Sequence, residues 1–252
     1  MIFIETIHMQ VHILENAQAI GINAGAMASS LINSAIHANG TAHIILATGS
    51  SQFEILHHLV QDHSIDWSKV SLFHLDEYIG IPETNRASFR KYLKERFIDQ
   101  VFSLKEIHLI QGDMEAAPEC DRLSELIREH PIDLALVGIG ENGHLAFNDP
   151  PADFETIIPY IIVELDDACR KQQLGEGWFD SLKDVPTRAI SMSIKQIMKS
   201  KHIICSVPDK RKAIAVKNCL LGEISNQYPA SILQLHEDCD LYLDKSSASL
   251  II

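Results

Sequence analysis

The stretch AHIILATGSSQFEILHHLVQ, residues 42–61, contains an expected strand, a turn and a helix in immediate succession. Residues 42–48 are a short, isoleucine-rich run that is typical of a buried strand, and residues 52–61 have the apolar spacing of a helix. The turn between them consists of small residues: Thr48, Gly49, Ser50 and Ser51. This order predicts a strand–turn–helix unit of an α/β protein.

The same alternation recurs along the chain. Further strands are predicted at 70–78, 106–112, 132–140, 201–207 and 239–244. Helices are predicted at 11–38, where Asn39-Gly40 supplies a stop signal, and at 87–98, 115–130 and 209–222. Because strands that alternate with helices are joined by right-handed crossovers, the pattern predicts a mostly parallel sheet flanked by helices. No repeat or flexible linker divides residues 1–252, so we expect a single domain.

The composition limits the possible partners. With 46% hydrophobic residues and a net charge of −13, the chain has the composition of a soluble globular protein. The negative charge argues against general binding to nucleic acid or to an anionic membrane, although one local pocket can still take a small phosphorylated ligand. The five cysteines include no CxxC pair and predict neither a zinc site nor a disulfide framework. Residues 1–40 lack the pattern of a signal peptide, so we expect a cytoplasmic protein.

Polar residues follow the first of these strands in the segment Thr48–Ser51. A strand that leads through small residues into a helix presents unpaired backbone N–H groups at the positive end of that helix, where a phosphate can bind. The alternative is a plain turn in which Ser50 or Ser51 caps the helix. No Walker lysine or GxGxxG motif decides between the two.

A second polar strand end is FHLDEYIGIP, residues 73–82, with Asp76 and Glu77 next to each other. Adjacent residues of a strand point to opposite faces, so one carboxylate can enter a cleft while the other pairs elsewhere. The carboxylate in the cleft could act as a general base. The alternative is an acidic pair that only caps or pairs within a loop.

The third strand end is GIGENGHLAFNDP, residues 138–150. Its glycines indicate backbone that approaches a ligand closely or adopts positive φ. His144 can exchange protons near neutral pH, and Glu141 or Asp149 could orient its ring. A loop histidine without a catalytic role is the alternative. Because ligands of parallel sheets bind beyond the carboxyl ends of strands, three polar strand ends together favour a catalytic site.

Four segments, LATGSS, FHLDEYIGIP, GIGENGHLAFNDP and VPDKRKAIAVKNCLLG, resemble in order and spacing the glucosamine-6-phosphate deaminase (isomerase) family. The resemblance runs from about residue 20 to residue 245. It implies a modified Rossmann-type fold without metal or organic cofactor. It also implies conversion of glucosamine 6-phosphate and water to fructose 6-phosphate and ammonia.

The resemblance also implies roles for individual residues. Asp76 matches the base for proton transfer between C2 and C1, and His144 matches the histidine of ring opening. Asp149 stands where the family usually has a glutamate, and Asn142 where many members have an aspartate. We therefore consider Glu141 as a replacement for the missing charge. The phosphate ligands would be the Thr48–Ser51 loop, Lys212 and, as candidates for a second basic residue, Arg170 or Lys171.

Three alternatives stay open at this point. One is 6-phosphogluconolactonase, which shares the fold but typically reads GHxASLFP and DER where this chain reads GHLAFNDP and DEY. Another is deamination of a different amino-sugar phosphate, such as galactosamine 6-phosphate. The last is a sugar-phosphate-binding protein without turnover, either a regulator or a degenerate enzyme. The expected ligand is a phosphorylated amino sugar. The expected oligomeric state is a monomer or a small homo-oligomer.

Overall fold

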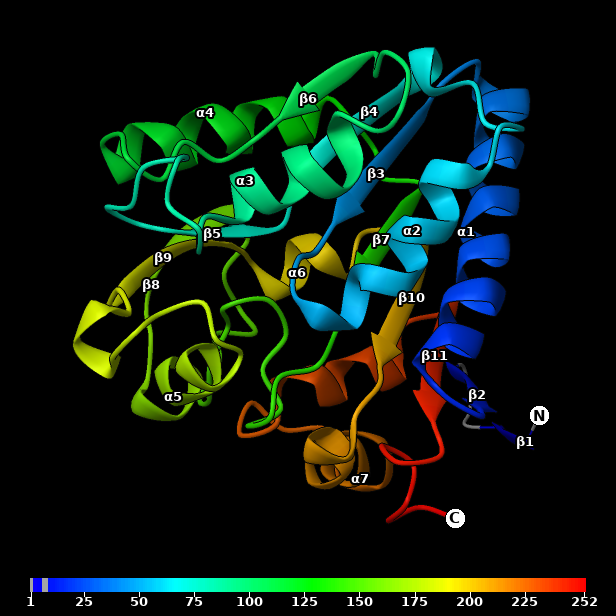
Figure 1. The fold of residues 1–252 in the computed structure, drawn as a ribbon, viewed down its shortest axis with the longest axis vertical. Helices are drawn as coiled ribbons and strands as arrows, with labels where there is room; N and C mark the ends of the chain where they lie inside the picture. Colours follow the sequence, from blue (N-terminus) through cyan, green and yellow to red (C-terminus); the bar gives the residue numbers. More distant parts are fainter. Residues whose placement is uncertain (1, 6–8) are drawn as a thin grey trace.

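The computed structural model describes residues 2–5 and 9–252, and its centre is an eight-stranded sheet with the order β1-β2-β11-β10-β7-β3-β4-β6 (Figure 1). The antiparallel edge strand β1 (Ile2–Glu5) pairs with β2 (Met9–Leu14), and every other neighbouring pair is parallel. The other strands are β3 (Ala42–Leu46), β4 (Val70–His74), β6 (Glu106–His108), β7 (Leu134–Val137), β10 (His202–Val207) and β11 (Cys239–Asp244). The predicted α/β fold with a mostly parallel sheet is confirmed.

A second, antiparallel sheet has the order β5-β9-β8 and was not predicted. Its strands are β5 (Asp76–Tyr78), β9 (Arg188–Met192) and β8 (Tyr160–Glu164). The single strand predicted at 70–78 is therefore wrong, because the chain changes sheets at Leu75. The Leu75 N–H donates to Leu46 O of the large sheet at 3.3 Å, and its carbonyl accepts from Met192 N of the small sheet at 2.9 Å.

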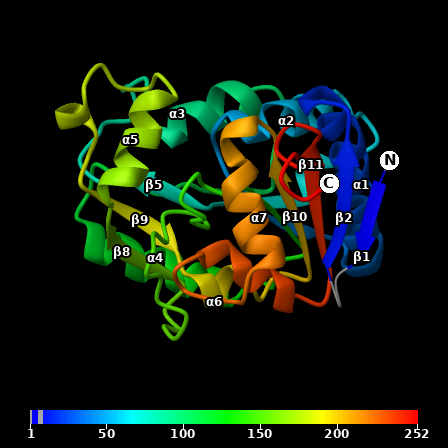
Figure 2. The same ribbon diagram turned by 90° about the horizontal axis from the view of Figure 1, so that it is seen from below.

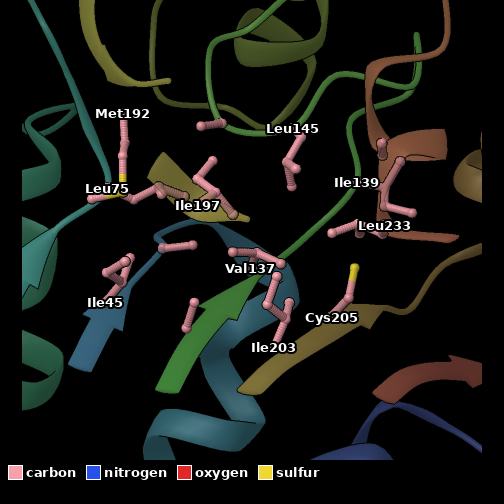
Figure 3. Packing of buried hydrophobic residues seen from close by; sticks show 14 of the residues in the cluster. Ile45, Leu75, Val137, Ile139, Leu145, Met192, Ile197, Ile203, Cys205 and Leu233 are labelled. Atoms are coloured by element: carbon pink, nitrogen blue, oxygen red, sulfur yellow. The ribbon is translucent and has the colours of Figure 1, made fainter. Parts of the chain in front are cut away.

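Helices cover both faces of the large sheet. On one face lie α1 (Ala17–Asn39), α2 (Phe53–Gln61) and α3 (Phe89–Leu93), and on the other lie α4 (Ala116–Arg128), α6 (Ile194–Ile197) and α7 (Ala213–Leu221). The side chains of β3 show why two layers form: Ile44 and Leu46 are buried with the first group of helices, and Ile45 with the second. Figure 3 shows Ile45, Val137 and Ile203, from three neighbouring strands, in this second core. The remaining helix, α5 (Asp167–Gly175), lies beside the small sheet (Figure 2).

The beginning of α1 differs from the prediction of a helix over 11–38. Residues up to Leu14 belong to β2, and the helix begins at Ala17 after the cap residue Asn16, whose side chain accepts from Ala19 N at 2.9 Å. The alternation of buried Met9, Val11 and Ile13 is the strand signal that explains the difference. The predicted stop is confirmed: Gly40 has φ +78° and donates its N–H to Ile36 O.

By length and composition alone, α1 could cross a membrane. In the fold, 44% of its most apolar window is buried, and Ala24, Ala28 and Ile32 pack fully buried against the sheet. Packing in the core accounts for these buried residues, whereas Ile22 of the same helix is 56% exposed.

Candidate functional site

A cleft of about 340 Å³ opens at the carboxyl ends of the central strands. Seven of the residues singled out in the sequence line it: Thr48, Gly49, Ser50, Ser51, Asp76, His144 and Lys212. The strands β3, β4, β7 and β10 end at the same edge of the sheet, and the segments that follow them line the cleft. Residues as far apart in the chain as Thr48 and Lys212, 164 positions, therefore meet there. Asn142, Asp149, Glu141 and Arg170 lie outside the lining.

The loop after β3 has the geometry of an anion-binding turn. Gly49 adopts φ +93°, and a 3₁₀ turn over Ser50–Gln52 then leads into α2. Only glycine adopts this backbone conformation without strain. Directly after the neighbouring strand β7, a Cβ added to Gly138 would lie 2.9 Å from Ser51 Oγ, so glycine is needed there for close approach. All four residues of the turn, Thr48–Ser51, line the cleft.

Lys212 provides a buried cation beside this turn. It ends the 3₁₀ turn Lys210–Lys212 that follows β10, and its side chain is 8% exposed. Within residues 9–252, its ammonium group makes no hydrogen bond or ion pair. Burial lowers the pKa of Lys212, and the nearby carboxylates of Glu176 and Glu141 oppose this effect. A buried, unpaired ammonium group facing a cleft is suited to bind an anion.

Asp76 and Glu77 have separate environments, as the alternation of a strand predicts. The carboxylate of Glu77 is fully buried and accepts from Ser88 Oγ at 2.8 Å and from Arg90 N at 2.9 Å. Asp76 instead faces the cleft. Burial, reinforced by the charge of Glu77, raises the pKa of Asp76 to about 8. A carboxyl group with this pKa exchanges protons near neutral pH, as a general base must.

His144 also lines the cleft, and Asp149, which lies outside the lining, contacts its ring. Its Nδ1 lies 3.0 Å from Asp149 Oδ1, in a close contact that lacks the alignment of a hydrogen bond. Asn142 donates from Nδ2 to the same Oδ1 at 3.0 Å and accepts from the backbone N–H of His144 at 3.0 Å. Burial favours a neutral Asp149, but the contacts with His144 and Asn142 outweigh it and hold its pKa below the usual value. An ionised Asp149 therefore backs the imidazole.

Glu141 points to a different partner. Its carboxylate lies 3.4 Å from Arg211 Nη1, and its backbone N–H donates to Gln172 Oε1 at 2.7 Å. Among the described residues, Arg211 is the ion-pair partner of Glu141, and Asp149 is that of His144. The carboxylate beside the His144 ring is therefore that of Asp149 and not that of Glu141.

Arg170 is turned away from the cleft. Its Nη2 donates to Leu182 O at 2.7 Å and to Val185 O at 3.1 Å, which fastens the segment after α5. Lys171 is exposed and does not line the cleft either. The second basic residue of the lining is Arg211, one position before Lys212. Arg211 was not predicted as a residue of the site, although it lies in the segment VPDKRKAIAVKNCLLG.

Three polar residues of the lining come from α5 and the residue after it: Gln172, Gln173 and Glu176. Gln173 Oε1 accepts from the hydroxyl of Tyr78, in β5 of the small sheet, at 2.7 Å. Glu176 accepts from Gln172 Nε2 at 3.0 Å and from Trp178 Nε1 at 3.3 Å. The surrounding sequence, DDACRKQQLGEGWF, has no clear periodicity that could have predicted that this helix covers the cleft.

Comparisons with known proteins agree on one family. The family described as glucosamine-6-phosphate isomerases/6-phosphogluconolactonase matches residues 15–242. A glucosamine-6-phosphate deaminase of Streptococcus suis is 33% identical over 245 residues, which are 97% of this chain and 100% of that protein. A glucosamine-6-phosphate deaminase of Streptococcus pneumoniae is 34% identical over 231 residues, which are 91% of this chain and 95% of that protein.

Solved structures give the same result for the fold. A monomeric glucosamine-6-phosphate deaminase superposes with a TM-score of 0.87 at 29% identity, covering 95% of this chain and 99% of its own. The 6-phosphogluconolactonase of Thermotoga maritima reaches a TM-score of 0.79 at 14% identity, covering 94% of this chain and 100% of its own. At 14% identity, the similarity to this lactonase supports the fold alone.

Proposed function

The chain belongs to the family of glucosamine-6-phosphate isomerases and 6-phosphogluconolactonases, and from this premise we propose that it converts glucosamine 6-phosphate and water to fructose 6-phosphate and ammonia. The observation that carries the proposal is the position of Asp76. A carboxyl group whose pKa is raised to about 8 shares one cleft with His144 and with the unpaired ammonium group of Lys212. The names of the deaminase relatives support this choice of substrate.

We assign the binding of the sugar's phosphate group to the Thr48–Ser51 loop. Its N–H groups and the ammonium group of Lys212 would compensate the charge of the phosphate. Arg211 lies at the same end of the cleft, where Asp209 and Glu141 pair with its guanidinium group. This local arrangement explains how a protein with a net charge of −13 can hold a phosphorylated substrate.

His144 is assigned to ring opening. In the cyclic sugar, the bond between C1 and the ring oxygen breaks when the O1 hydroxyl loses a proton and the ring oxygen gains one. An imidazole can take up the first proton and supply the second. The ionised carboxylate of Asp149 at 3.0 Å from Nδ1 stabilises the imidazolium form that arises in between.

Asp76 is assigned to the transfer of a proton from C2 to C1 in the opened sugar. Its carboxylate removes the C2 proton while O1 takes up a proton from the C2 ammonium group, which gives an enolamine, and the same carboxyl group then returns its proton to C1. The resulting imine at C2 then takes up water and releases ammonia. Because one group first accepts and then donates the proton, a pKa near 8 suits both half-steps.

The proposal is tested by measuring ammonia release from glucosamine 6-phosphate and from galactosamine 6-phosphate, and hydrolysis of 6-phosphogluconolactone. We expect turnover of glucosamine 6-phosphate to exceed that of the other two substrates. Faster hydrolysis of the lactone would instead identify a lactonase. Binding of the sugar phosphates without turnover would identify a sugar-phosphate-binding protein.

Lys212→Met is expected to raise KM for glucosamine 6-phosphate by about 10- to 150-fold, because a charge-assisted contact with the phosphate contributes ~1.5–3 kcal/mol. The effect on kcat should be much smaller, since Lys212 is assigned to the phosphate and not to the reacting carbons. Steady-state kinetics separate the two parameters. The matched control is Lys210→Met, two positions earlier and exposed, which should leave both unchanged. A KM of Lys212→Met within threefold of wild type would contradict the assignment.

A further inference from the structure

A cluster of Glu106, His108 and His130 lies far from the candidate site. Glu106 and His108 belong to the edge strand β6, and His130 follows the end of α4, just before β7 begins. Figure 1 shows β6 and α4 at the opposite side of the molecule from α5 and α7, which border the cleft. The three side chains are partly exposed, at 37%, 13% and 17%, so an ion can reach them from solvent.

The spacing of the ligand atoms fits a tetrahedral cation. Glu106 Oε2 lies 3.0 Å from His108 Nε2 and 3.2 Å from His130 Nε2, and all three atoms lie within 4.8 Å of one another. Around a zinc ion with bonds of ~2.1 Å, neighbouring ligand atoms are about 3.4 Å apart. The three atoms can therefore bind one ion after shifts of a few tenths of an ångström to about 1 Å.

The neighbours of His130 hold it in the form that binds a metal. Its Nδ1 lies 2.7 Å from the carbonyl oxygen of Leu126, which can only accept, so Nδ1 carries the proton. In the neutral ring, the lone pair of Nε2 then faces the carboxylate of Glu106. Such a hydrogen bond from the second ring nitrogen to a carbonyl is typical of metal-binding histidines. Two electron-rich atoms at 3.2 Å attract a proton or a cation into the space between them.

The imidazole rings of His108 and His130 also pack against one aromatic side chain. The buried ring of Phe73 lies 4.5 Å from the ring of His108 and 5.4 Å from that of His130, measured between centroids. Packing on one aromatic side chain limits the rotation of both imidazoles. A site whose ligands are held in place before the ion arrives loses less conformational entropy on binding.

Two other groups of possible ligands are less suitable. In the first, both ring nitrogens of His202 are already paired, with Asp238 at 2.9 Å and with Asp240 at 2.8 Å. The second contains His144 and Asp149 of the candidate site together with Cys169. Burial raises the pKa of the Cys169 thiol, so the thiolate that a metal needs is disfavoured.

We propose that Glu106, His108 and His130 bind one divalent transition-metal ion of the zinc class, with water in the fourth position. The ion would join the short edge strand β6 to the end of α4. It would thereby stabilise the edge of the large sheet without taking part in the chemistry of the cleft. Two histidines and a carboxylate are a ligand set that zinc uses in proteins, and they hold it through three bonds.

The test is titration of the chelator-treated protein with Zn²⁺, followed by calorimetry and by thermal unfolding. We expect one ion per chain and an increase of Tm with Zn²⁺ concentration. His108→Gln and His130→Gln should each weaken binding by at least about tenfold, because loss of a direct ligand costs no less than loss of its supporting contact. His63→Gln, at an exposed histidine elsewhere, is the control and should bind as wild type.

Melting curves without metal show whether the variants fold, and Glu106→Gln is a third variant that keeps the shape of the side chain. Absence of saturable Zn²⁺ binding below about 1 mM would overturn the proposal. Wild-type affinity in the two histidine variants would also overturn it. So would loss of binding confined to Asp238→Asn or Cys169→Ser, since the ion would then occupy one of the other two groups.

Discussion

Asp76→Asn is expected to lose nearly all ammonia release and, at the same time, to unfold at a higher temperature than the wild type. The loss of activity follows because an amide cannot accept the C2 proton, and a positioned base contributes roughly 10²–10⁴-fold to the rate. The gain in stability follows from burial, which raises the pKa of Asp76 to about 8. An amide of the same shape removes the ionisable group from this environment.

The sign of the stability effect depends on pH. In the unfolded chain, Asp76 ionises near the ordinary pKa of an aspartate, 3.8, and in the folded protein its pKa is about 8. Between these values the folded state keeps a proton that the unfolded state has lost, so rising pH destabilises the wild type by up to ~1.4 kcal/mol per pH unit. The difference in Tm between Asp76→Asn and the wild type should therefore be small near pH 4, grow towards pH 8 and then level off.

Thermal unfolding at a series of pH values, together with the pH dependence of kcat/KM, checks both halves of this prediction. For the wild type, kcat/KM should rise with pH up to about 8, because the base must be ionised. The control Asp180→Asn removes an exposed carboxylate and should change neither activity nor the pH dependence of Tm. An Asp76→Asn protein with near-wild-type turnover would refute the assignment of the base, whatever its stability.

The sequence located the residues that directly follow buried strands, and the reason is geometric. In a parallel sheet the carboxyl ends of all strands meet at one edge, so polar residues that come shortly after an apolar run, such as Ser51, Asp76 and His144, are expected at that edge. The assignment needs only the end of each strand. It therefore holds although β7 covers Leu134–Val137 instead of the predicted 132–140.

The parts that the sequence did not predict depend on contacts between distant segments. β5 contains three residues and pairs with β9, more than a hundred positions later, so nothing near Asp76 separates it from β4. Similarly, α5 has a weak pattern of its own and is placed over the cleft by contacts such as Gln172 with Glu141. Arg170 was a candidate phosphate ligand and Arg211 was not considered, because the directions of both side chains depend on contacts with distant segments.

The position of His144 depends on a glycine that touches it. A Cβ added to Gly140 would lie 2.3 Å from three atoms of the His144 ring, so the ring packs directly on the glycine backbone. Gly140→Ala must therefore push the imidazole away from its place beside Asp149. A displacement of about 1 Å at a reacting group can lower a rate by roughly 100-fold, and we expect a loss of kcat of this size.

Because the change affects ring opening and not the phosphate end of the cleft, binding and turnover should separate. An acyclic sugar phosphate, which needs no ring opening, should bind Gly140→Ala with nearly wild-type Kd. Gly175→Ala is the matched control, since a Cβ there meets nothing within 4 Å, and it should keep wild-type kcat. If Gly140→Ala retained full turnover on the cyclic substrate, the imidazole of His144 would not be the group that opens the ring. A parallel loss of affinity for the acyclic compound would show instead that the substitution disturbs the whole cleft.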